Sequence, residues 1–143
     1  MGQSFKDLIA WQKAVSITVA VYKLTSRFPA SERFGLTNRM RRSAVSIAST
    51  IAEGCGRSTK GEHLLFLGHA RGSRCELETQ VFLAKKLGFG SLAGLDEVEQ
   101  RCDDACRLLG ALIKSVQTKR FQSLSPQVPQ SLFKDRCQYA LSS

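Results

Sequence analysis

The sequence of 143 residues contains little proline and no long apolar run. Its three prolines are Pro29, Pro126 and Pro129, so residues 30–125 contain none. Because proline is excluded from helix interiors, this stretch permits long helices. No apolar run approaches the roughly 18 residues that span a membrane, and the first residues lack the basic and apolar segments of a secretion signal. We therefore expect a cytoplasmic protein.

The cysteines and histidines do not form a recognisable metal site. The five cysteines are an odd number and include no Cys-x-x-Cys pair, which argues against a disulfide framework and a zinc ribbon. Cys102 and Cys106 lie one helical turn apart, but His63 and His69 are six residues apart and point to different faces of a helix. We predict no metal and no cofactor, and expect reduced thiols in a helical core, at Cys55, Cys75, Cys102, Cys106 and Cys137.

Motifs of catalysis are also missing. The sequence contains no phosphate-binding glycine loop, nucleophile elbow, metal-binding helix motif or kinase signature. Two pairs of carboxylates occur, Glu76 with Glu78 and Asp103 with Asp104, but such close spacing on a helix points the two groups in different directions. We therefore predict no catalytic residues and a protein that is not an enzyme.

What the sequence does contain is a helical period, because apolar residues recur at spacings of three and four. The first helix is expected from Phe5 to Ser26, with Leu8, Trp11, Val15, Val19 and Tyr22 on its main stripe and Ile17, Val21 and Leu24 beside it. The second is expected from Leu36 to Glu53, with these residues inward: Leu36, Met40, Ala44, Ile47 and Ile51.

Two further helices follow. The capping-box pattern Thr59-Lys-Gly-Glu62 opens the third, which ends at Gly88 and has the apolar stripe Leu67, Ala70, Leu77, Val81 and Ala84. The fourth follows Gly94 and has the seam Leu95, Val98, Cys102, Leu109, Ile113 and Val116.

Four long helices with short connections favour an all-α, up-down-up-down antiparallel four-helix bundle. We assign it to residues 1–120. Residues 121–143 include the stretch SLSPQVPQSLF at 123–133 and show no helical periodicity. We predict that they form a flexible C-terminal tail rich in Pro, Ser and Gln.

Two helices carry small or apolar residues outside the stripe that a bundle needs. The second helix has Val45, Ala48 and Ala52, and the third has Gly68, Gly72, Cys75 and Thr79. Each interior glycine costs about 1 kcal/mol relative to alanine, which close approach of another helix would offset. Tight packing within the bundle is one explanation. We favour the other, a homo-oligomer interface at these residues.

Arg74 falls within the apolar stripe of the third helix. If it is buried it needs a partner, and the candidates are Glu53, Glu76 and Glu78, of which Glu78 has the favourable spacing of four residues. The alternative is that Arg74 lies at the edge of the stripe and extends to water.

The charge balance is strongly basic, with 21 Lys and Arg against 12 Asp and Glu and a net charge of +9. The excess lies in the first two helices and their flanks, and the densest group is Arg39, Arg41, Arg42, Arg57 and Lys60. Arginine matches phosphate geometry, so this group is our candidate nucleic-acid-binding site. Pairing with carboxylates of another helix or subunit is the alternative. No aromatic residue lies within this group to stack on bases.

Three segments carry a resemblance to a known family. They are FKDLIAWQKAV, then VYKLTSRFPASERFGLTNRMRRSAVSIASTIAEGCGR, then EHLLFLGHARGSRCELETQVFLAKKLGF. In order and spacing, over about residues 5–118, they resemble the bacterial four helix bundle proteins. These include proteins encoded within intervening sequences of large-subunit ribosomal RNA genes and the accessory variability proteins of diversity-generating retroelements. Where relatives commonly read Ile-Pro-Ser-Asn-Ile, this chain has Ile-Ala-Ser-Thr-Ile at 47–51.

The resemblance implies a four-helix protomer in a ring-like homopentamer with a basic surface. For the retroelement members it also implies binding to a reverse transcriptase and to nucleic acid. We therefore expect a non-enzymatic, homopentameric basic accessory protein that binds RNA or DNA. The alternative is an adaptor for an acidic protein partner, such as a polymerase or reverse transcriptase, that does not touch nucleic acid itself.

Overall fold

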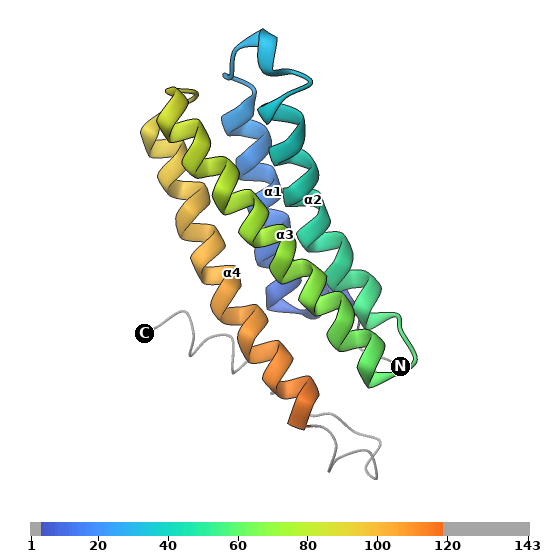
Figure 1. Cartoon of the computed structure of the whole chain (residues 1–143). Helices are drawn as coiled ribbons and strands as arrows, with labels where there is room; N and C mark the ends of the chain where they lie inside the picture. Colours follow the sequence, from blue (N-terminus) through green and yellow to red (C-terminus); the bar gives the residue numbers. More distant parts are fainter. Residues whose placement is uncertain (1–3, 119–143) are drawn as a thin grey trace.

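The computed structural model describes residues 4–118, and the predicted tail from 121 onward lies outside them. These residues form four α-helices and two short 3-10 helices (Figure 1). In chain order they are η1 (Phe5–Asp7), α1 (Ile9–Thr25), η2 (Ala30–Glu32), α2 (Leu36–Cys55), α3 (Lys60–Leu87) and α4 (Leu92–Thr118).

The four helices form the predicted antiparallel bundle. Helix α1 packs against α2 and α4, and α3 packs against the same two neighbours. The connections between α2 and α3 and between α3 and α4 are short, which forces successive helices to run in opposite directions. The longer connection between α1 and α2 contains η2 and projects from the top of the bundle in Figure 1.

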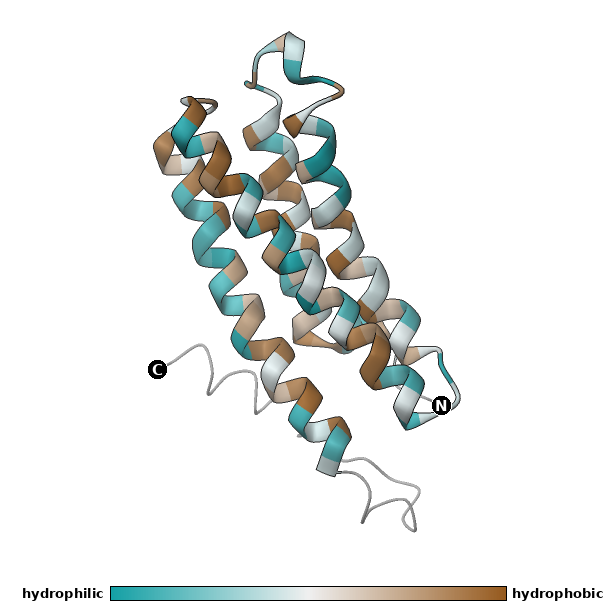
Figure 2. Ribbon diagram, in the orientation of Figure 1, coloured by the Kyte–Doolittle hydropathy of each residue, from teal (hydrophilic) through white to brown (hydrophobic). Residues whose placement is uncertain are grey.

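The core lies between the helices and is filled mainly by aliphatic residues and alanine. The stripes predicted for the second and third helices are correct, since every residue of both is buried. The seam of α4 is also correct except at Ile113, which is only half-buried, and Ala105 and Leu108 extend it. Figure 2 also shows hydrophobic segments near both ends of α3. Four large apolar residues of this helix are exposed and lie outside the core: Leu65, Phe82, Leu83 and Leu87.

The prediction for the first helix was wrong in two respects. The chain forms η1, then becomes extended at Leu8 before α1 starts, because the Ser4 hydroxyl and the Asp7 carboxylate close a separate short turn. The main stripe was also misplaced, since Val19 is 50 % exposed and Tyr22 is 45 % exposed. Small residues centre the buried face instead, which comprises Ala10, Ala14, Ile17, Val21 and Leu24.

The ends of α2 and α3 follow from glycine and threonine. Helix α2 continues to Cys55, two residues beyond the prediction, because Gly54 is a buried helical residue that allows close approach of α3. A Cβ at Gly54 would lie 3.1 Å from the Cβ of Phe66. The Thr59 hydroxyl accepts a hydrogen bond from the Glu62 amide and starts α3, as predicted. Gly88 ends α3 with a left-handed φ of 73°, also as predicted.

Helix α4 begins at Leu92, before the predicted position after Gly94. Gly94 lies in the first turn, where the Ser91 hydroxyl accepts a hydrogen bond from its amide. A Cβ at Gly94 would lie 2.9 Å from Cδ1 of Leu24. This glycine therefore does not interrupt the helix but allows the end of α1 to approach α4 closely.

The expectation that the cysteines lie in a helical core is correct only at Cys102. Cys55, Cys75 and Cys106 are exposed, and Cys137 lies outside the described residues. In residues 4–118, no three His, Cys, Asp or Glu side chains are grouped as metal ligands. Nor is any helix of that part of the chain both long and apolar enough to cross a membrane.

Candidate nucleic-acid interface

The five basic residues predicted to bind nucleic acid do not form one patch. Arg39, Arg41 and Arg42 lie in the first two turns of α2, whereas Arg57 and Lys60 lie beyond its other end. Arg39 lies sixteen residues before the end of α2 at Cys55, which corresponds to about 24 Å of helix. The structure therefore divides the group between the two ends of the bundle.

Arg41 is used within the bundle. Its Nε donates a hydrogen bond of 2.9 Å to the Thr25 hydroxyl, and its guanidinium lies 4.5 Å from the centroid of the Tyr22 ring. Both partners belong to α1, so Arg41 joins α1 to α2 through a hydrogen bond and a cation–π contact. Its half-buried side chain is less available to a ligand than those of its neighbours.

Arg39 and Arg42 are exposed and line a groove of about 420 Å³ between α2 and α3. Ser43, Ser46 and Glu76 also line this groove. The Ser46 hydroxyl is hydrogen-bonded to the hydroxyl of Ser73 across the two helices, at 2.8 Å. Neither arginine forms an ion pair with another residue of 4–118, so within this part of the chain both guanidinium groups are open to a ligand on this side of α2.

The two basic residues at the other end have contacts of their own. The Arg57 guanidinium lies 4.5 Å from the centroid of the Phe66 ring. Lys60 Nζ donates a hydrogen bond of 2.6 Å to the backbone carbonyl of Gln117, in the last turn of α4. A cation at that position is favourable because the carbonyl end of a helix carries partial negative charge. These two residues therefore help to close the lower end of the bundle.

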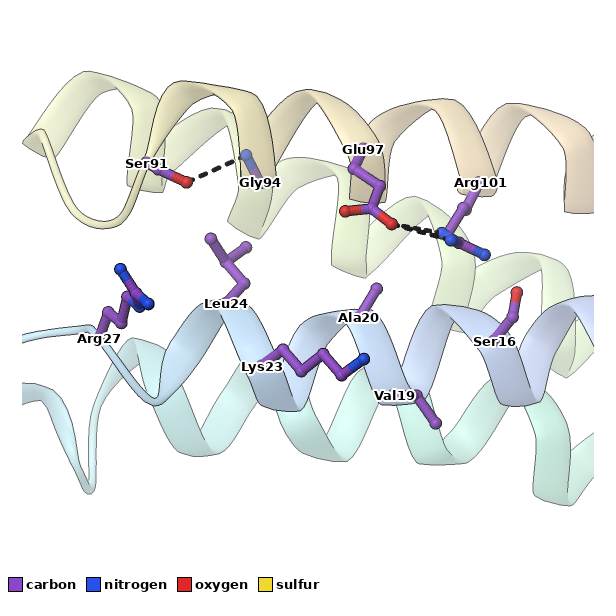
Figure 3. Close-up of a pocket in the computed structure, with 10 residues that line it drawn as sticks. All are labelled: Ser16, Val19, Ala20, Lys23, Leu24, Arg27, Ser91, Gly94, Glu97 and Arg101. Carbon is purple, nitrogen blue, oxygen red and sulfur yellow. Dashed lines mark hydrogen bonds and ion pairs between the residues drawn. The ribbon is translucent and has the colours of Figure 1, made fainter.

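Three basic residues near the upper end were not among the predicted site residues. Lys23 and Arg27 line a groove of about 460 Å³ between α1 and α4, shown in Figure 3. The third is Arg33, in the connection between α1 and α2. Across the groove of Figure 3, Arg101 is paired with Glu97 at 2.8 Å. The charge excess of this segment was visible in the sequence. That Lys23 and Arg27 lie at the same end of the bundle as the start of α2 follows only from the fold.

The charges divide the bundle into two halves. Residues 4–58 contain nine basic and three acidic residues, whereas residues 59–118 contain eight of each. Within residues 4–118 all five ion pairs are formed by residues of α3 and α4. The hairpin of α1, the connection and α2 therefore has its cations without carboxylate partners, and we call residues 9–55 the basic hairpin.

Of the two alternatives for Arg74, the structure shows the carboxylate partner. Its side chain is only 13 % exposed and is paired with Glu78, the predicted candidate at four residues' spacing. The Arg74 Nε has no hydrogen-bond partner. This pair lies beside Cys102 of α4, whose pKa is raised to about 12 mainly by burial, with a further increase from Glu78 and an opposing effect of Arg74.

The predicted interface residues of α2 lie on the flank that faces α1. Val45, Ala48 and Ala52 continue the stripe of Arg41 at spacings of four, three and four. Ala48 and Ala52 are half-buried, and Ala48 packs against the core. Packing within the bundle therefore accounts for part of this stripe, although Val45 remains 41 % exposed.

The predicted interface residues of α3 are different, since Gly68, Gly72, Cys75 and Thr79 are all exposed. A Cβ at Gly68 or Gly72 would meet no atom within 4 Å. Leu65 and Phe82, which extend the same stripe at its two ends, are 56 % and 58 % exposed. Close packing within one chain therefore does not explain these glycines. We call the stripe of Leu65, Gly68, Gly72, Cys75, Thr79 and Phe82 the outer face of α3.

The fold and the sequence together define the family. Residues 6–111 match the family model described as 23S rRNA-intervening sequence protein, and this chain belongs to that family. No curated protein sequence matches the chain.

A solved structure has the same fold. It is the crystal structure of a protein of unknown function from the S23 ribosomal protein family of Bacteroides thetaiotaomicron, with a TM-score of 0.66 and 18 % sequence identity. The similarity covers 73 % of this chain and 98 % of the other.

Proposed function

We propose that this protein is a non-enzymatic, self-associating protein that binds RNA or DNA through the basic hairpin. The observation that carries this proposal is the division of charge. Within residues 4–118 the basic hairpin has an excess of cations without carboxylate partners, whereas α3 and α4 together contain equal numbers of basic and acidic residues and form ion pairs. A surface of unpaired arginine attracts phosphate and releases its counterions on binding. The family description, which refers to 23S rRNA, supports nucleic acid as the polyanion.

Arg39 and Arg42 are the residues that we propose for phosphate contact, because both are exposed and line the same groove. Arg41, Arg57 and Lys60 already have partners within the chain, so their contribution to binding is secondary. Glu76 at the same groove sets a limit, since its carboxylate repels a phosphate placed beside it. The favoured position of the ligand is therefore on the α2 side of the groove.

Salt dependence tests this proposal. Fluorescence anisotropy with labelled RNA and DNA oligonucleotides at 50–400 mM KCl should give an affinity that falls steeply as salt rises. In the double variant Arg39→Gln/Arg42→Gln the slope of log affinity against log salt should become shallower by about one to two. The matched control is Arg101→Gln/Arg107→Gln, which removes two arginines that are already paired on α4 and should leave the slope nearly unchanged.

Two results would overturn the assignment. Wild-type protein that binds neither RNA nor DNA at 50 mM KCl contradicts the proposed function itself. Binding that is equally reduced by the Arg39/Arg42 variant and by the α4 control would mean that net charge alone, rather than the basic hairpin, determines affinity.

We also propose that copies of the chain associate through the outer face of α3. The support is that exposed glycines of a helix interior are unfavourable unless another helix approaches them, and none of the other three described helices does so. The large apolar side chains at the two ends of this face, Leu65 and Phe82, would also lose their exposure. Five copies is the number implied by the family resemblance, and we retain a homopentamer as the proposed assembly.

A second candidate function has an observation in its favour. Beyond the outer face, Leu83 and Leu87 of α3 are 44 % and 59 % exposed, and an acidic protein partner such as a polymerase or reverse transcriptase would cover such residues. An adaptor of this kind would not need the unpaired arginines to meet phosphate. Oligonucleotide binding that fails while a purified acidic partner binds would favour the adaptor.

A further inference from the structure

The connection between α1 and α2 presents an aromatic ring to solvent. Phe34 is 85 % exposed, more than any other large apolar residue in residues 4–118. The neighbouring Phe28 is buried and lies 5.9 Å from the ring centroid of Phe89, so the core takes one phenylalanine of this connection and leaves the other outside. The fold therefore does not require an aromatic residue at position 34.

The backbone that carries Phe34 is held by hydrogen bonds. The Glu32 amide donates to the Pro29 carbonyl, and the Gly35 amide donates to the Glu32 carbonyl, each at 2.9 Å. The Glu32 carboxylate accepts a hydrogen bond of 2.9 Å from the Leu36 amide and so caps the start of α2. The turn fixes the backbone position of residue 34, which lowers the entropy lost when a ligand stacks on the ring.

One cation contacts this ring, and others belong to the same end of the basic hairpin. The Arg33 guanidinium lies 5.5 Å from the centroid of the Phe34 ring. Residues 22–42, which form the upper end of the basic hairpin, contain six basic residues and a single acidic one, Glu32. The Glu32 carboxylate, which is hydrogen-bonded to the start of α2, offsets only one of these six positive charges. The site thus combines an exposed aromatic face with several positive charges.

We propose that Phe34 stacks on an unpaired base of single-stranded nucleic acid while Arg33 and the adjacent cations contact its phosphates. This inference rests on the proposed function and adds the form of the ligand and the residue that recognises it. Aromatic side chains stack on any base whose face is free, and arginine contributes through charge and cation–π contact. In a duplex the base faces are covered by their neighbours, so Phe34 discriminates in favour of single strands.

A protein ligand is the less suitable occupant of this site. A protein ligand would have to receive Phe34 in an apolar pocket of its own. The rim of that pocket would face the basic residues of 22–42, so it would need several carboxylates. A single strand supplies both kinds of group in every nucleotide, since each has one base and one phosphate. Single-stranded nucleic acid is therefore the occupant to which the proposal commits.

A tryptophan reporter tests this contact directly. Trp11 is the sole tryptophan, so Trp11→Phe/Phe34→Trp places the only indole at position 34. Titration with a 20-nucleotide oligouridylate should quench the indole fluorescence, whereas a blunt 20-base-pair RNA duplex at equal phosphate concentration should quench it far less. The Trp11→Phe variant alone serves as the blank.

Affinity provides the second readout. On the single strand, Phe34→Ala should lose at least about fivefold in affinity, and Phe34→Leu, which keeps apolar bulk without a π face, should behave similarly. Neither variant should change the salt slope, because no charge is removed. Far-UV circular dichroism should be unchanged, since Phe34 contributes almost nothing to the core.

The failures of the two proposals can be distinguished. If the Phe34 variants bind the single strand as wild type does, while Arg39→Gln/Arg42→Gln still reduces the salt slope, stacking is wrong and the proposed function stands. An equal loss on single strand and duplex also contradicts stacking. If wild-type protein binds neither ligand, the proposed function fails and the stacking contact fails with it.

Discussion

The buried thiol of Cys102 makes the stability of the fold depend on pH. Cys102 lies in the core of α4, and burial raises its pKa to about 12. In the unfolded chain the thiol ionises above its usual pKa of 9.0, whereas in the folded chain it keeps its proton. The folded state then binds more protons than the unfolded state, so the contribution of Cys102 to stability is complete below pH 9 and is lost as pH rises toward 12.

We predict a decrease in the free energy of unfolding of about 1.4 kcal/mol per pH unit from this thiol over that range. Urea unfolding at pH 8 to 11 measures it. The comparison is between variants that share every other ionisable group. Cys102→Ala should show a shallower decrease, and Cys106→Ala, which removes an exposed thiol, should match wild type. Equal pH dependence in all three proteins would contradict the assignment.

Arg41 and Arg42 are neighbours with different roles. Arg41 donates a hydrogen bond to Thr25 and stacks on Tyr22, whereas Arg42 is exposed and has no ion pair among the residues that the structure describes. We predict that Arg41→Gln lowers the free energy of unfolding by about 1–2 kcal/mol, through loss of a hydrogen bond and a cation–π contact. Arg42→Gln should change it by less than about 0.5 kcal/mol. Thermal and urea unfolding of both variants, measured together, would refute this if the two arginines were equally important.

At the residue scale the sequence predicted partners within one helix better than partners between helices. The spacing of four residues identified Glu78 for Arg74, because such pairs depend only on helical geometry. The contact of Arg41 with Tyr22 joins residues nineteen positions apart, and no local pattern indicates it. The same limitation placed five basic residues in one site that the fold divides between two ends of the bundle.

At the scale of elements, α3 has one face in the core and another in solvent. A substitution at Gly72 tests whether another copy of the chain covers the second face. In an isolated chain Gly72→Ala should stabilise α3 by about 0.5–1 kcal/mol, because alanine favours the helix and the new Cβ meets no atom. In an oligomer formed through this face, the same methyl group would hinder the approach of the neighbouring helix. We therefore predict that Gly72→Ala weakens assembly while it strengthens the helix.

Sedimentation velocity and thermal unfolding measure the two effects. The matched control is Gly110→Ala on α4, where an added Cβ likewise meets nothing within 4 Å. That variant should gain helix stability without a change in sedimentation. A wild-type chain that sediments as a monomer at all concentrations, or a Gly72→Ala protein that assembles as wild type does, would contradict an interface on the outer face of α3.

The helices themselves were largely predictable, and their ends were less so. Every residue of the apolar stripes predicted on α2 and α3 is buried, since a bundle helix needs one apolar face. On α1 the rule failed because alanines form the close contact and large apolar residues such as Val19 remain outside. Gly54 and Gly94 fell just outside the predicted bounds of the second and fourth helices, whereas in the structure they lie within those helices and allow two helices to approach.

At the scale of the whole molecule, the period of the sequence and its few prolines were sufficient for the four-helix bundle. The total charge of +9 was equally plain, but its consequence depends on which carboxylates the fold brings to which cations. The antiparallel packing of α3 against α4 brings Lys85 to Asp96 and Glu99, and such pairs neutralise that half. The surplus of the basic hairpin is left without a counterpart, which only the assembled bundle shows.

This separation of charge also gives the molecule an electric dipole moment directed across the bundle, from the balanced pair α3 and α4 toward the basic hairpin. In the field of a polyanion a dipole experiences a torque. A molecule that approaches with the wrong side foremost is therefore turned during the encounter, at distances up to the Debye length of about 8–10 Å. The bundle that neutralises half of itself thereby gains a preferred direction of approach, and dilute salt should increase the rate of association as well as the affinity.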